Sequence, residues 1–353
     1  MPLFKHLSSL EIAQNLRAFL RLEVGLVRGE VPDLEQNLEA QALKLRQAEY
    51  QVHQLRKQLA NRDRRSIGLN EGQNESVVNA IAPENIIWIF GTARVGSTWL
   101  AHMMEELENY RVWREPWVGL LFGEFYYERA RNWQYDNKHF ILGLHKETWL
   151  RSIRYFVLDG AEATFPKMDS DDLLVIKEPN GSIGAPLMME ALPESRMILL
   201  IRDPRDVIAS TLDAEKSTSW AGKLTEGNSM ADTQPDVVVS KRSTKYLRYI
   251  SAAKQAYESH KGRKVMVKYE DLLSDTLNTT KHLCLTLGIP FDEDELAQAV
   301  EKHSWENVPE DQKGEGKFHR KAAPGTWKED LTPKQVEMVE QITAPLLKEF
   351  YGG

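Results

Sequence analysis

The sequence predicts an α/β fold: a doubly wound, mostly parallel sheet flanked by helices, preceded by an N-terminal helical and coiled-coil segment. Two observations lead to this prediction. Short apolar runs rich in β-branched residues, which are typical of buried strands, alternate with amphipathic stretches of helical spacing. The first run, Ile86–Phe90, is followed by a loop between two glycines and then by a helical stretch, an order that suits anion binding.

The composition excludes several classes of protein. The net charge of −7 argues against a general nucleic-acid binder. The lone cysteine, Cys284, excludes an internal disulfide framework and a multi-cysteine zinc site, and we expect it to fill core space. No stretch is apolar enough to span a bilayer, and the N-terminus lacks the pattern of a signal peptide. We therefore expect a cytoplasmic protein without a nucleic-acid partner or an integral membrane segment.

The chain divides into an N-terminal appendage and one main domain. Residues 1–30 have the spacing of an amphipathic helix, which would pack on the body or a partner, or else lie on a membrane surface. Residues 31–62 carry a heptad seam, which predicts a coiled coil and hence a homo-oligomer; a long helix folded back on the main domain is the alternative. Residues 63–82 are polar and predict a linker, so the main domain spans 83–353.

Strands and helices alternate through the main domain. The predicted strands are Ile86–Phe90, a strand or loop over Tyr110–Trp117, Leu173–Lys177, Met197–Ile201 and Lys264–Lys268. The predicted helices are Ser97–Leu107, an aromatic helical region over 119–158, Pro204–Ala214, Thr244–His260, 275–287, 293–302 and Pro333–Phe350, with a loop over 215–240. Because ligands bind at the carboxyl ends of strands in such sheets, we expect the loops 91–96, 178–181 and 202–206 to meet.

The first loop, Gly91–Gly96, has the features of an anion site. The helix after it begins with backbone N–H groups that have no partner inside the helix, and the helix dipole favours negative charge there. Gly96 lets the backbone approach a phosphate, while Arg94 adds a fixed positive charge. The glycine spacing resembles a Walker A loop, but Ser97 stands where its Lys is expected, which disfavours an ordinary ATPase or kinase. The alternative is an ordinary glycine-containing turn.

Three later stretches also suit an anionic ligand. Arg202 leaves a buried strand and Ser210 follows two turns into the next helix, so both can point at one phosphate. Tyr269 opens a short Tyr-Glu-Asp stretch at the end of another strand. The basic segment 318–332 suggests a negatively charged ligand because the protein as a whole is acidic. Each stretch also has a simpler interpretation, such as a capped strand end or a charged helix start.

The four stretches resemble, in the same order, the nucleotide-binding motifs of the sulfotransferases, which have a P-loop NTPase-like fold and use the sulfate donor PAPS. The resemblance spans 86–332 and leaves 1–82 uncovered. The residues that it assigns to binding PAPS and the product PAP are Arg94, Val95, Gly96, Ser97, Thr98, Trp99, Arg202, Ser210, Tyr269, Trp305, Arg320, Lys321 and Gly325. It implies that Trp99 stacks on the adenine and that Trp305 holds the other face. Ala322 stands where the family has the first glycine of its last motif.

The resemblance also implies the catalytic residues. Arg94 would stabilise the bridging oxygen of the leaving phosphate, and Lys177 matches a second catalytic Lys of the family. Cytosolic members have Lys-x-His at this strand end, but here Lys177 is followed by Glu178 and a proline, so no His can take the proton. Glu115 matches the base of bacterial and tyrosylprotein members, and Glu178 is the alternative base. Glu115 could instead pair with Arg114 or cap a turn.

We therefore expect in-line transfer of a sulfuryl group from PAPS to a phenol or alcohol hydroxyl of a small-molecule, lipid-like or natural-product acceptor. The aromatic residues over 119–158 suit the wall of an apolar pocket. No metal is expected, because no metal-ligand spacing appears. We expect His102, His145 and His319 to be structural or surface residues. The alternatives are a P-loop-type kinase, which would need ATP and magnesium, and a non-catalytic scaffold that binds PAP and uses the coiled coil.

Overall fold

The computed structural model describes residues 81–125, 145–169, 171–216, 219–220 and 234–352. The predicted N-terminal helix and coiled coil lie outside the described residues, as does the predicted linker up to residue 80. The last two linker residues are described, and Ile81 is buried in the core of the main domain. Packing of this domain therefore includes residues that the polar composition assigns to the linker.

Five parallel strands form the sheet of the main domain. They are β1 (Ile86–Phe90), β2 (Tyr110–Arg114), β3 (Leu173–Lys177), β4 (Arg196–Ile201) and β5 (Lys264–Lys268). Their order across the sheet is β2-β3-β1-β4-β5, and every neighbouring pair is parallel. All residues of β1 and β3 are buried, because both faces of the sheet centre are covered, and this explains their continuous apolar runs. The predicted parallel sheet is confirmed.

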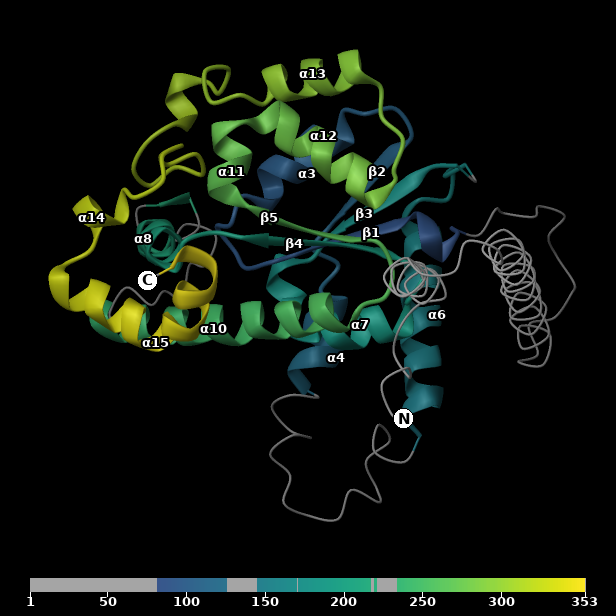
Figure 1. The fold of residues 1–353 in the computed structure, drawn as a ribbon, viewed down its shortest axis with the longest axis horizontal. Helices are drawn as coiled ribbons and strands as arrows, with labels where there is room; N and C mark the ends of the chain where they lie inside the picture. Colours follow the sequence, from purple (N-terminus) through teal and green to yellow (C-terminus); the bar gives the residue numbers. More distant parts are fainter. Residues whose placement is uncertain (1–80, 126–144, 170, 217–218, 221–233, 353) are drawn as a thin grey trace, which may run out of the picture. The chain divides into compact units, whose positions relative to one another are not determined.

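Helices cover both faces of the sheet (Figure 1). One face carries α3 (Ser97–Glu105), α11 (Tyr269–Ser274), α12 (Thr276–Leu287) and α13 (Glu293–Lys302). The other carries α4 (Val118–Phe125), α6 (Lys146–Thr164), α7 (Ala185–Ala191), α10 (Pro235–Ser259) and α15 (Pro333–Tyr351), with α8 (Pro204–Ala214) packed against α10 and α15. The shorter elements are η1 (Pro83–Asn85), η4 (Pro179–Gly184), η6 (Glu310–Gln312) and α14 (Trp327–Asp330). Crossovers on both faces make the sheet doubly wound, as predicted.

The core lies at the centre of the sheet. All five side chains of β1 are fully buried, and Trp88 and Phe90 stack with ring centroids 5.4 Å apart. Because side chains alternate along a strand, these two rings share one face of the sheet. Burying a large apolar side chain contributes about 1.5–3 kcal/mol, so β1 alone supplies a substantial part of the stability of the sheet. The strand that precedes the first loop is thus held firmly in place.

The largest difference from a predicted boundary is at the start of α10. Helix α10 begins at Pro235 rather than at Thr244, so the end of the predicted loop over 215–240 is helical. Proline suits the first helical position, Asp236 in the first turn is favoured by the helix dipole, and Val238 and Val239 are buried. Tertiary burial therefore begins this helix earlier than the local composition suggests. The predicted strand β5 ends at Lys268 as expected, and the Tyr-Glu-Asp stretch directly after it opens the short helix α11.

Glycines bring α4 unusually close to η4. A Cβ atom on Gly119 would lie 2.2 Å from the Gly181 oxygen, and one on Gly123 would lie 2.3 Å from the Gly184 Cα atom. Real Cβ atoms do not approach other atoms so closely, so only glycine permits this contact. The close packing fixes the start of α4 against the segment that follows β3.

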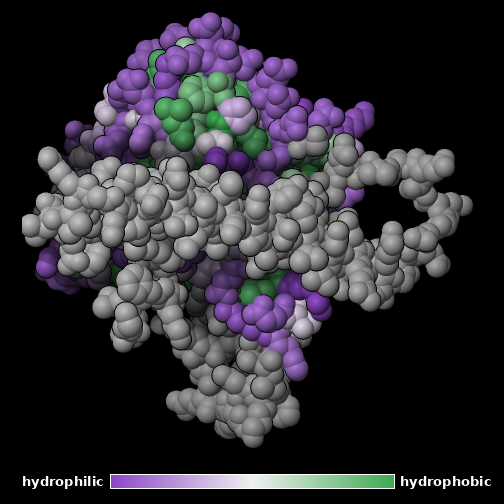
Figure 2. Space-filling model, turned by 45° about the vertical axis from the view of Figure 1, so that its right-hand side comes forward, coloured by the Kyte–Doolittle hydropathy of each residue, from purple (hydrophilic) through white to green (hydrophobic). Residues whose placement is uncertain are grey.

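Most of the residues that Figure 2 colours are hydrophilic, and a hydrophobic area bordered by polar residues lies in the upper half of the view. Among the helices of the described residues, none combines the length and the apolar character that crossing a membrane requires. The large hydrophobic side chains exposed on the described part of the chain include Trp117 and Leu121, which lie next to each other at the start of α4. This part of the surface borders the cavity described below.

Candidate active site

Three loops meet at the carboxyl ends of β1, β3 and β4, as predicted. The Gly91 N–H donates a hydrogen bond of 2.8 Å to the Ser182 Oγ atom of η4. On the other side, the Arg202 Nη1 atom donates to the Arg94 carbonyl at 3.0 Å. The loop Gly91–Gly96 is therefore fixed between the ends of the neighbouring strands, at the sheet edge where ligands bind in folds of this kind.

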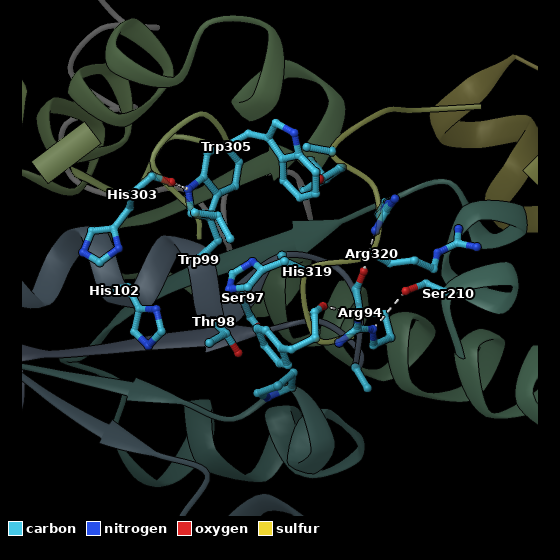
Figure 3. Close-up of a pocket in the computed structure, with 18 of the residues that line it drawn as sticks. Arg94, Ser97, Thr98, Trp99, His102, Ser210, His303, Trp305, His319 and Arg320 are labelled. Atoms are coloured by element: carbon cyan, nitrogen blue, oxygen red, sulfur yellow. Dashed lines mark hydrogen bonds between the residues drawn. The ribbon is translucent and has the colours of Figure 1, made fainter. Parts of the chain in front are cut away.

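A cavity of about 820 Å³ opens over this loop. Figure 3 shows side chains from the first loop and α3, from α8 and from the segment 303–320 pointing into it. Predicted site residues that line it are Arg94, Gly96, Ser97, Thr98, Trp99, Glu115, Lys177, Arg202, Ser210, Tyr269, Trp305, Arg320 and Lys321. The fold thus brings together residues that are more than 200 positions apart in the sequence.

Two of the predicted residues do not line the cavity. The Val95 side chain is fully buried beneath the loop, where it can hold the loop but not contact a ligand. The Gly325 N–H donates to the Asp206 Oδ2 atom at 2.7 Å instead of facing the cavity. His102 and His319, which we expect to be structural or surface residues, also line the cavity.

The first loop leads directly into the N-terminus of α3. Gly96 caps this helix with a left-handed backbone, φ +92°, and a Cβ atom there would lie 2.6 Å from the Tyr269 ring. Ser97 and Thr98 begin the helix and line the cavity, so the first backbone N–H groups and two hydroxyl groups lie at one point. This arrangement favours a phosphate or sulfate group.

Arg94 lies over the mouth of this anion site. Its Nε atom donates to the Ser210 Oγ atom at 2.9 Å, and its Nη2 atom donates to the Phe318 carbonyl at 2.9 Å. The guanidinium group also lies over the rings of Phe318 and Trp220. Burial, together with the charges of the nearby Arg202 and Arg320, lowers the pKa of Arg94 to about 10, so the group is still positively charged at neutral pH.

Arg202 is buried, with 6% of its surface exposed, and lies over the Tyr269 ring at 4.2 Å. Its Nε atom has no hydrogen-bond partner among the described residues. A buried donor without a partner costs about 1–3 kcal/mol, so such a group usually awaits a ligand. Neither Arg94 nor Arg202 forms an ion pair with a described carboxylate, which leaves both charges available to an anion.

The C-terminal basic segment closes the other side of the cavity. Arg320 pairs with Asp330 at 2.8 Å, and Lys321 pairs with the same carboxylate at 3.1 Å. Asp206, which is fully buried on α8, accepts hydrogen bonds from the N–H groups of Gly325 and Trp327. Because α8 also carries Ser210, Asp206 joins the basic segment to the helix that contacts Arg94.

Aromatic rings line the end of the cavity beyond the anion site. Trp99 donates from its Nε1 atom to the His303 carbonyl at 2.8 Å and meets Tyr269 edge to face, with ring centroids 6.1 Å apart. Trp305 lies nearby with the Lys313 ammonium over its ring at 5.2 Å. These rings form an apolar wall suited to a planar heterocycle.

Lys177 and Glu115 meet beside Thr98 in the same cavity. The Lys177 Nζ atom lies 2.5 Å from the Glu115 Oε1 atom and 3.3 Å from the Thr98 hydroxyl. The second Glu115 oxygen accepts from the Asn180 Nδ2 atom at 2.7 Å. The alternative pairing of Glu115 with Arg114 does not occur, because Arg114 pairs with Glu105. A carboxylate, an ammonium group and a hydroxyl thus lie within reach of one reacting group.

The turn that carries Glu115 has an unusual backbone. Glu115 and Trp117 adopt left-handed conformations, with φ of +51° and +63°. Such a conformation costs roughly 1–2 kcal/mol for a residue with a Cβ atom. The Glu115 N–H donates to the Lys177 carbonyl at 2.8 Å, which continues the pairing of β2 with β3. The surrounding structure must supply the rest of the free energy that holds this turn.

Several residues of the site are not ones that sequence reasoning singles out individually. Trp220, Phe318 and Asn180 line the cavity, and Asp206 supports the basic segment. Asp206 lies within the Arg-Asp-Pro-Arg-Asp stretch of the second anion motif, but its role appears only when residue 325 is brought beside it. The described residues contain no group of three or more His, Cys, Asp or Glu side chains placed to hold a metal ion.

The parallel sheet and the loop that leads from β1 into α3 define the P-loop-like class of α/β protein. The helix N-terminus, the two hydroxyl groups and the two arginines at this loop suit a phosphate or sulfate group. The family model described as "Sulfotransferase domain" matches residues 84–351. The chain belongs to the sulfotransferase family, and it is an enzyme that transfers sulfuryl groups.

Among solved structures, similar folds include mouse sulfotransferase SULT7A1 complexed with PAP, at 13% identity and a TM-score of 0.49, covering 77% of this chain and 90% of that one. Sulfotransferase STF9 from Mycobacterium avium matches at 14% identity and a TM-score of 0.46, covering 76% of this chain and 78% of that one. Retinol dehydratase in complex with androsterone and PAP matches at 18% identity and a TM-score of 0.42, covering 77% and 83%. A search of the curated proteins finds no match.

Proposed function

We propose that this sulfotransferase transfers a sulfuryl group from PAPS to a hydroxyl group of a small acceptor, with Glu115 as the base. The observation that carries the proposal is the contact of Glu115 with Lys177 in the same cavity as the anion loop, with their atoms 2.5 Å apart. A base, a cation and a helix N-terminus that binds an anion are the groups that in-line transfer to a hydroxyl requires.

The residues of the cavity fit PAPS as donor. The Arg202 Nε atom is buried and has no described partner, and Ser210 lies 2.9 Å from Arg94, so these groups suit the 3′-phosphate. The helix N-terminus with Thr98 suits the phosphosulfate, and the rings of Trp99 and Tyr269 suit the adenine. When bound, PAPS supplies the sulfuryl group and leaves as PAP. The proposed donor site thus uses both charges that the protein leaves without a carboxylate partner.

The proposed roles of the catalytic residues follow from their positions. Glu115 accepts the proton of the acceptor hydroxyl as its oxygen attacks sulfur. Lys177, between the Thr98 hydroxyl and Glu115, stabilises the charge on the transferred group. Arg94 stabilises the negative charge that develops on the leaving phosphate oxygen as the bond from sulfur to that oxygen breaks. This assignment is the Arg and Glu type rather than the Lys and His type of the family.

Glu115 is favoured over Glu178 as the base by position. The described lining of the cavity includes Glu115 but not Glu178. Glu178 is 1% exposed and its carboxylate faces the backbone of Trp117. A general base must reach the proton that it removes, directly or through one water, and only Glu115 meets this condition among the two.

The acceptor end of the cavity suits an apolar or aromatic alcohol. Trp117, two residues after Glu115, lines the cavity and is 52% exposed, and Leu121 follows it on α4. Such surfaces bind apolar molecules whose one polar group meets Glu115. We propose a phenol or alcohol of a lipid-like or natural-product acceptor, and a panel of such compounds with PAPS would identify the preferred class.

The donor site can be tested by calorimetric titration with PAP, beside a parallel titration with ATP and magnesium. Micromolar PAP binding without magnesium, and weak ATP binding, are expected. Preferred binding of ATP with magnesium would favour a kinase-like function instead. Arg202→Ala should weaken PAP binding by about 10–100-fold, because a buried charge-assisted contact contributes about 1.5–3 kcal/mol. Unchanged affinity in this variant would contradict the 3′-phosphate assignment.

We also propose that residues 31–62 associate as a coiled coil and make the enzyme a homo-oligomer. The support is the heptad spacing of the sequence, since these residues lie outside the described part of the chain. Light scattering of the full chain and of a variant that begins at residue 78 tests this. Equal association states for the two proteins would contradict the proposal.

A further inference from the structure

Glu178 is a buried carboxylate that the proposed reaction does not use. It follows Lys177 at the end of β3, and because side chains alternate along a strand, the two point to opposite sides. Lys177 reaches the cavity, while the Glu178 carboxylate accepts the Trp117 N–H at 3.0 Å and a second backbone hydrogen bond from Gly119. Glu178 therefore contacts the turn of Glu115 from below, away from any ligand.

The space around Glu178 is shaped to hold it in one position. A Cβ atom on Gly181 would lie 1.9 Å from the Glu178 Oε1 atom, so only glycine leaves room for the carboxylate there. The Glu178 N–H donates to the Ile89 carbonyl at 3.0 Å, which ties its backbone to β1. Its position is thus determined by β1, by η4 and by the close packing of η4 against α4.

The turn above Glu178 is held at Glu115 by a backbone hydrogen bond to Lys177, and at the Trp117 N–H by Glu178. Its residues Glu115 and Trp117 both carry a side chain in a left-handed conformation, which is unfavourable without support. Trp117 is half exposed, so apolar burial does not fix it. The hydrogen bond from its N–H to Glu178 joins it to the core of the domain instead.

We propose that Glu178 is a positioning residue for the transfer reaction, because its carboxylate holds the backbone of Trp117 and Gly119 and thereby aims Glu115 at Lys177 and the cavity. This inference rests on the proposed role of Glu115 as the base. It assigns a function to the second carboxylate of the strand end without requiring it to contact substrate. Displacing a catalytic group by about 1 Å costs on the order of 100-fold in rate, which sets the size of the expected effect.

The ionised carboxylate suits this role better than the neutral acid. Two oxygens of the ionised form accept both backbone N–H groups, whereas a protonated oxygen would add a donor where donors already point. Burial, with the nearby charge of Glu115, raises the pKa of Glu178 to about 7, while the two backbone hydrogen bonds and Lys177 act to lower it. Protonation in mildly acidic solution is therefore expected to loosen the contact with the turn locally, while it removes a buried charge and so raises the free energy of unfolding of the whole domain.

The variant Glu178→Gln tests the proposal. We expect kcat with PAPS and 2-naphthol, a simple phenol, to fall about 100-fold, while the dissociation constant for PAP stays within about twofold. Because the variant removes a buried charge, its midpoint of thermal unfolding at pH 8 should not fall below that of the wild type. An unchanged kcat would overturn the proposal, and so would a joint fall of kcat, PAP affinity and stability, which would indicate a purely structural role.

Asp172→Asn is the matched control. Asp172 is a buried carboxylate just before the other end of β3, where it accepts the Asp169 N–H at 3.2 Å and pairs with Arg111 at 3.4 Å. Its loss should lower stability and leave kcat unchanged. If the Gln variant does not fold, Glu178→Asp replaces it, since the charge stays but the carboxylate is drawn back; a smaller loss of kcat with unchanged PAP affinity supports the proposal, and wild-type kcat overturns it.

A crystal structure of Glu178→Gln gives a result that needs no acceptor. We expect Trp117 to leave the left-handed region and Glu115 to move away from Lys177, and an unchanged turn would overturn the proposal. PAP binding to the wild-type enzyme is measured first and tests the proposed function alone. Absence of PAP binding to the wild type would contradict the proposed donor site. Normal PAP binding together with unchanged Glu178 variants would contradict only the proposed role of Glu178.

Discussion

Two turns on either side of β3 supply the reacting groups, and they are stabilised in different ways. The loop after β1 places its left-handed positions at Arg94 and at Gly96, and it leads into the dipole of α3. The turn after β2 has left-handed residues at Glu115 and Trp117, and no glycine stands among 115–117. Lys177 reaches both, through Thr98 on one side and Glu115 on the other.

The difference shows two ways to hold an unfavourable backbone at a site. In the first loop the strain is relieved at Gly96, which has no Cβ atom to meet the Tyr269 ring, and it remains only at Arg94. In the second turn the strain stays, and a buried side chain from the neighbouring strand offsets it. The first solution is visible as a glycine in the sequence, and the second depends on residues that are distant along the chain.

The largest expected effect is on chemistry at the second turn. Glu115→Gln should lower kcat by about 10²–10⁴-fold, which is the usual contribution of a general base. PAP affinity should change little, because the first loop does not depend on this carboxylate. Single-turnover measurements with PAPS, together with PAP titration, check both statements. Retained turnover would show that the second turn does not supply the base.

A smaller effect is expected from adding a methyl group to the first loop. Gly96→Ala would place a Cβ atom 2.6 Å from the Tyr269 ring on a backbone with φ +92°, and we expect PAP affinity to fall about 10–30-fold. Trp117→Gly is the matched control in the second turn, because glycine accepts its φ of +63°, and stability should change by less than about 1 kcal/mol. PAP titration and denaturant unfolding of both variants test the comparison. A loss of stability in Trp117→Gly as large as that in Gly96→Ala would contradict it.

The smallest effect concerns pH and the carboxylate beneath the second turn. The pKa of Glu178 is raised from its ordinary 4.5 to about 7 in the folded protein, so its contribution to stability is full below the unfolded pKa and is lost as pH rises through about 7. Lowering the pH from about 7.5 to about 6 should therefore stabilise the wild type by about 1 kcal/mol relative to Glu178→Gln. Activity should fall over the same range. Denaturant unfolding at the two pH values measures the difference, and a difference of opposite sign would exclude the buried charge.

The parts of the molecule that the sequence predicts are those with local causes. The strands β1 and β3 have their predicted bounds because strands buried on both faces need apolar runs, and the first loop is marked by its glycines. The predicted bounds of β5 are also confirmed, although its burial alternates along the strand. The start of α10 was wrong because Val238 and Val239 are buried by partners distant in sequence. For the same reason the contacts of Asp206 and Glu178 could not be predicted, since their backbone partners lie far along the chain.

The alternation of side chains in β3 makes its length a functional quantity. Lys177 faces the cavity and Glu178 faces the core because successive side chains of a strand point to opposite sides of the sheet. Inserting one residue before Lys177 would exchange the two sides, which would send a carboxylate toward the anion site and an ammonium group into the core. Inserting two would restore the order. Natural variation in the length of this strand is therefore expected in steps of two residues. A chimera that takes β3 from another protein must differ in strand length by an even number of residues, so that Lys177 still faces the cavity.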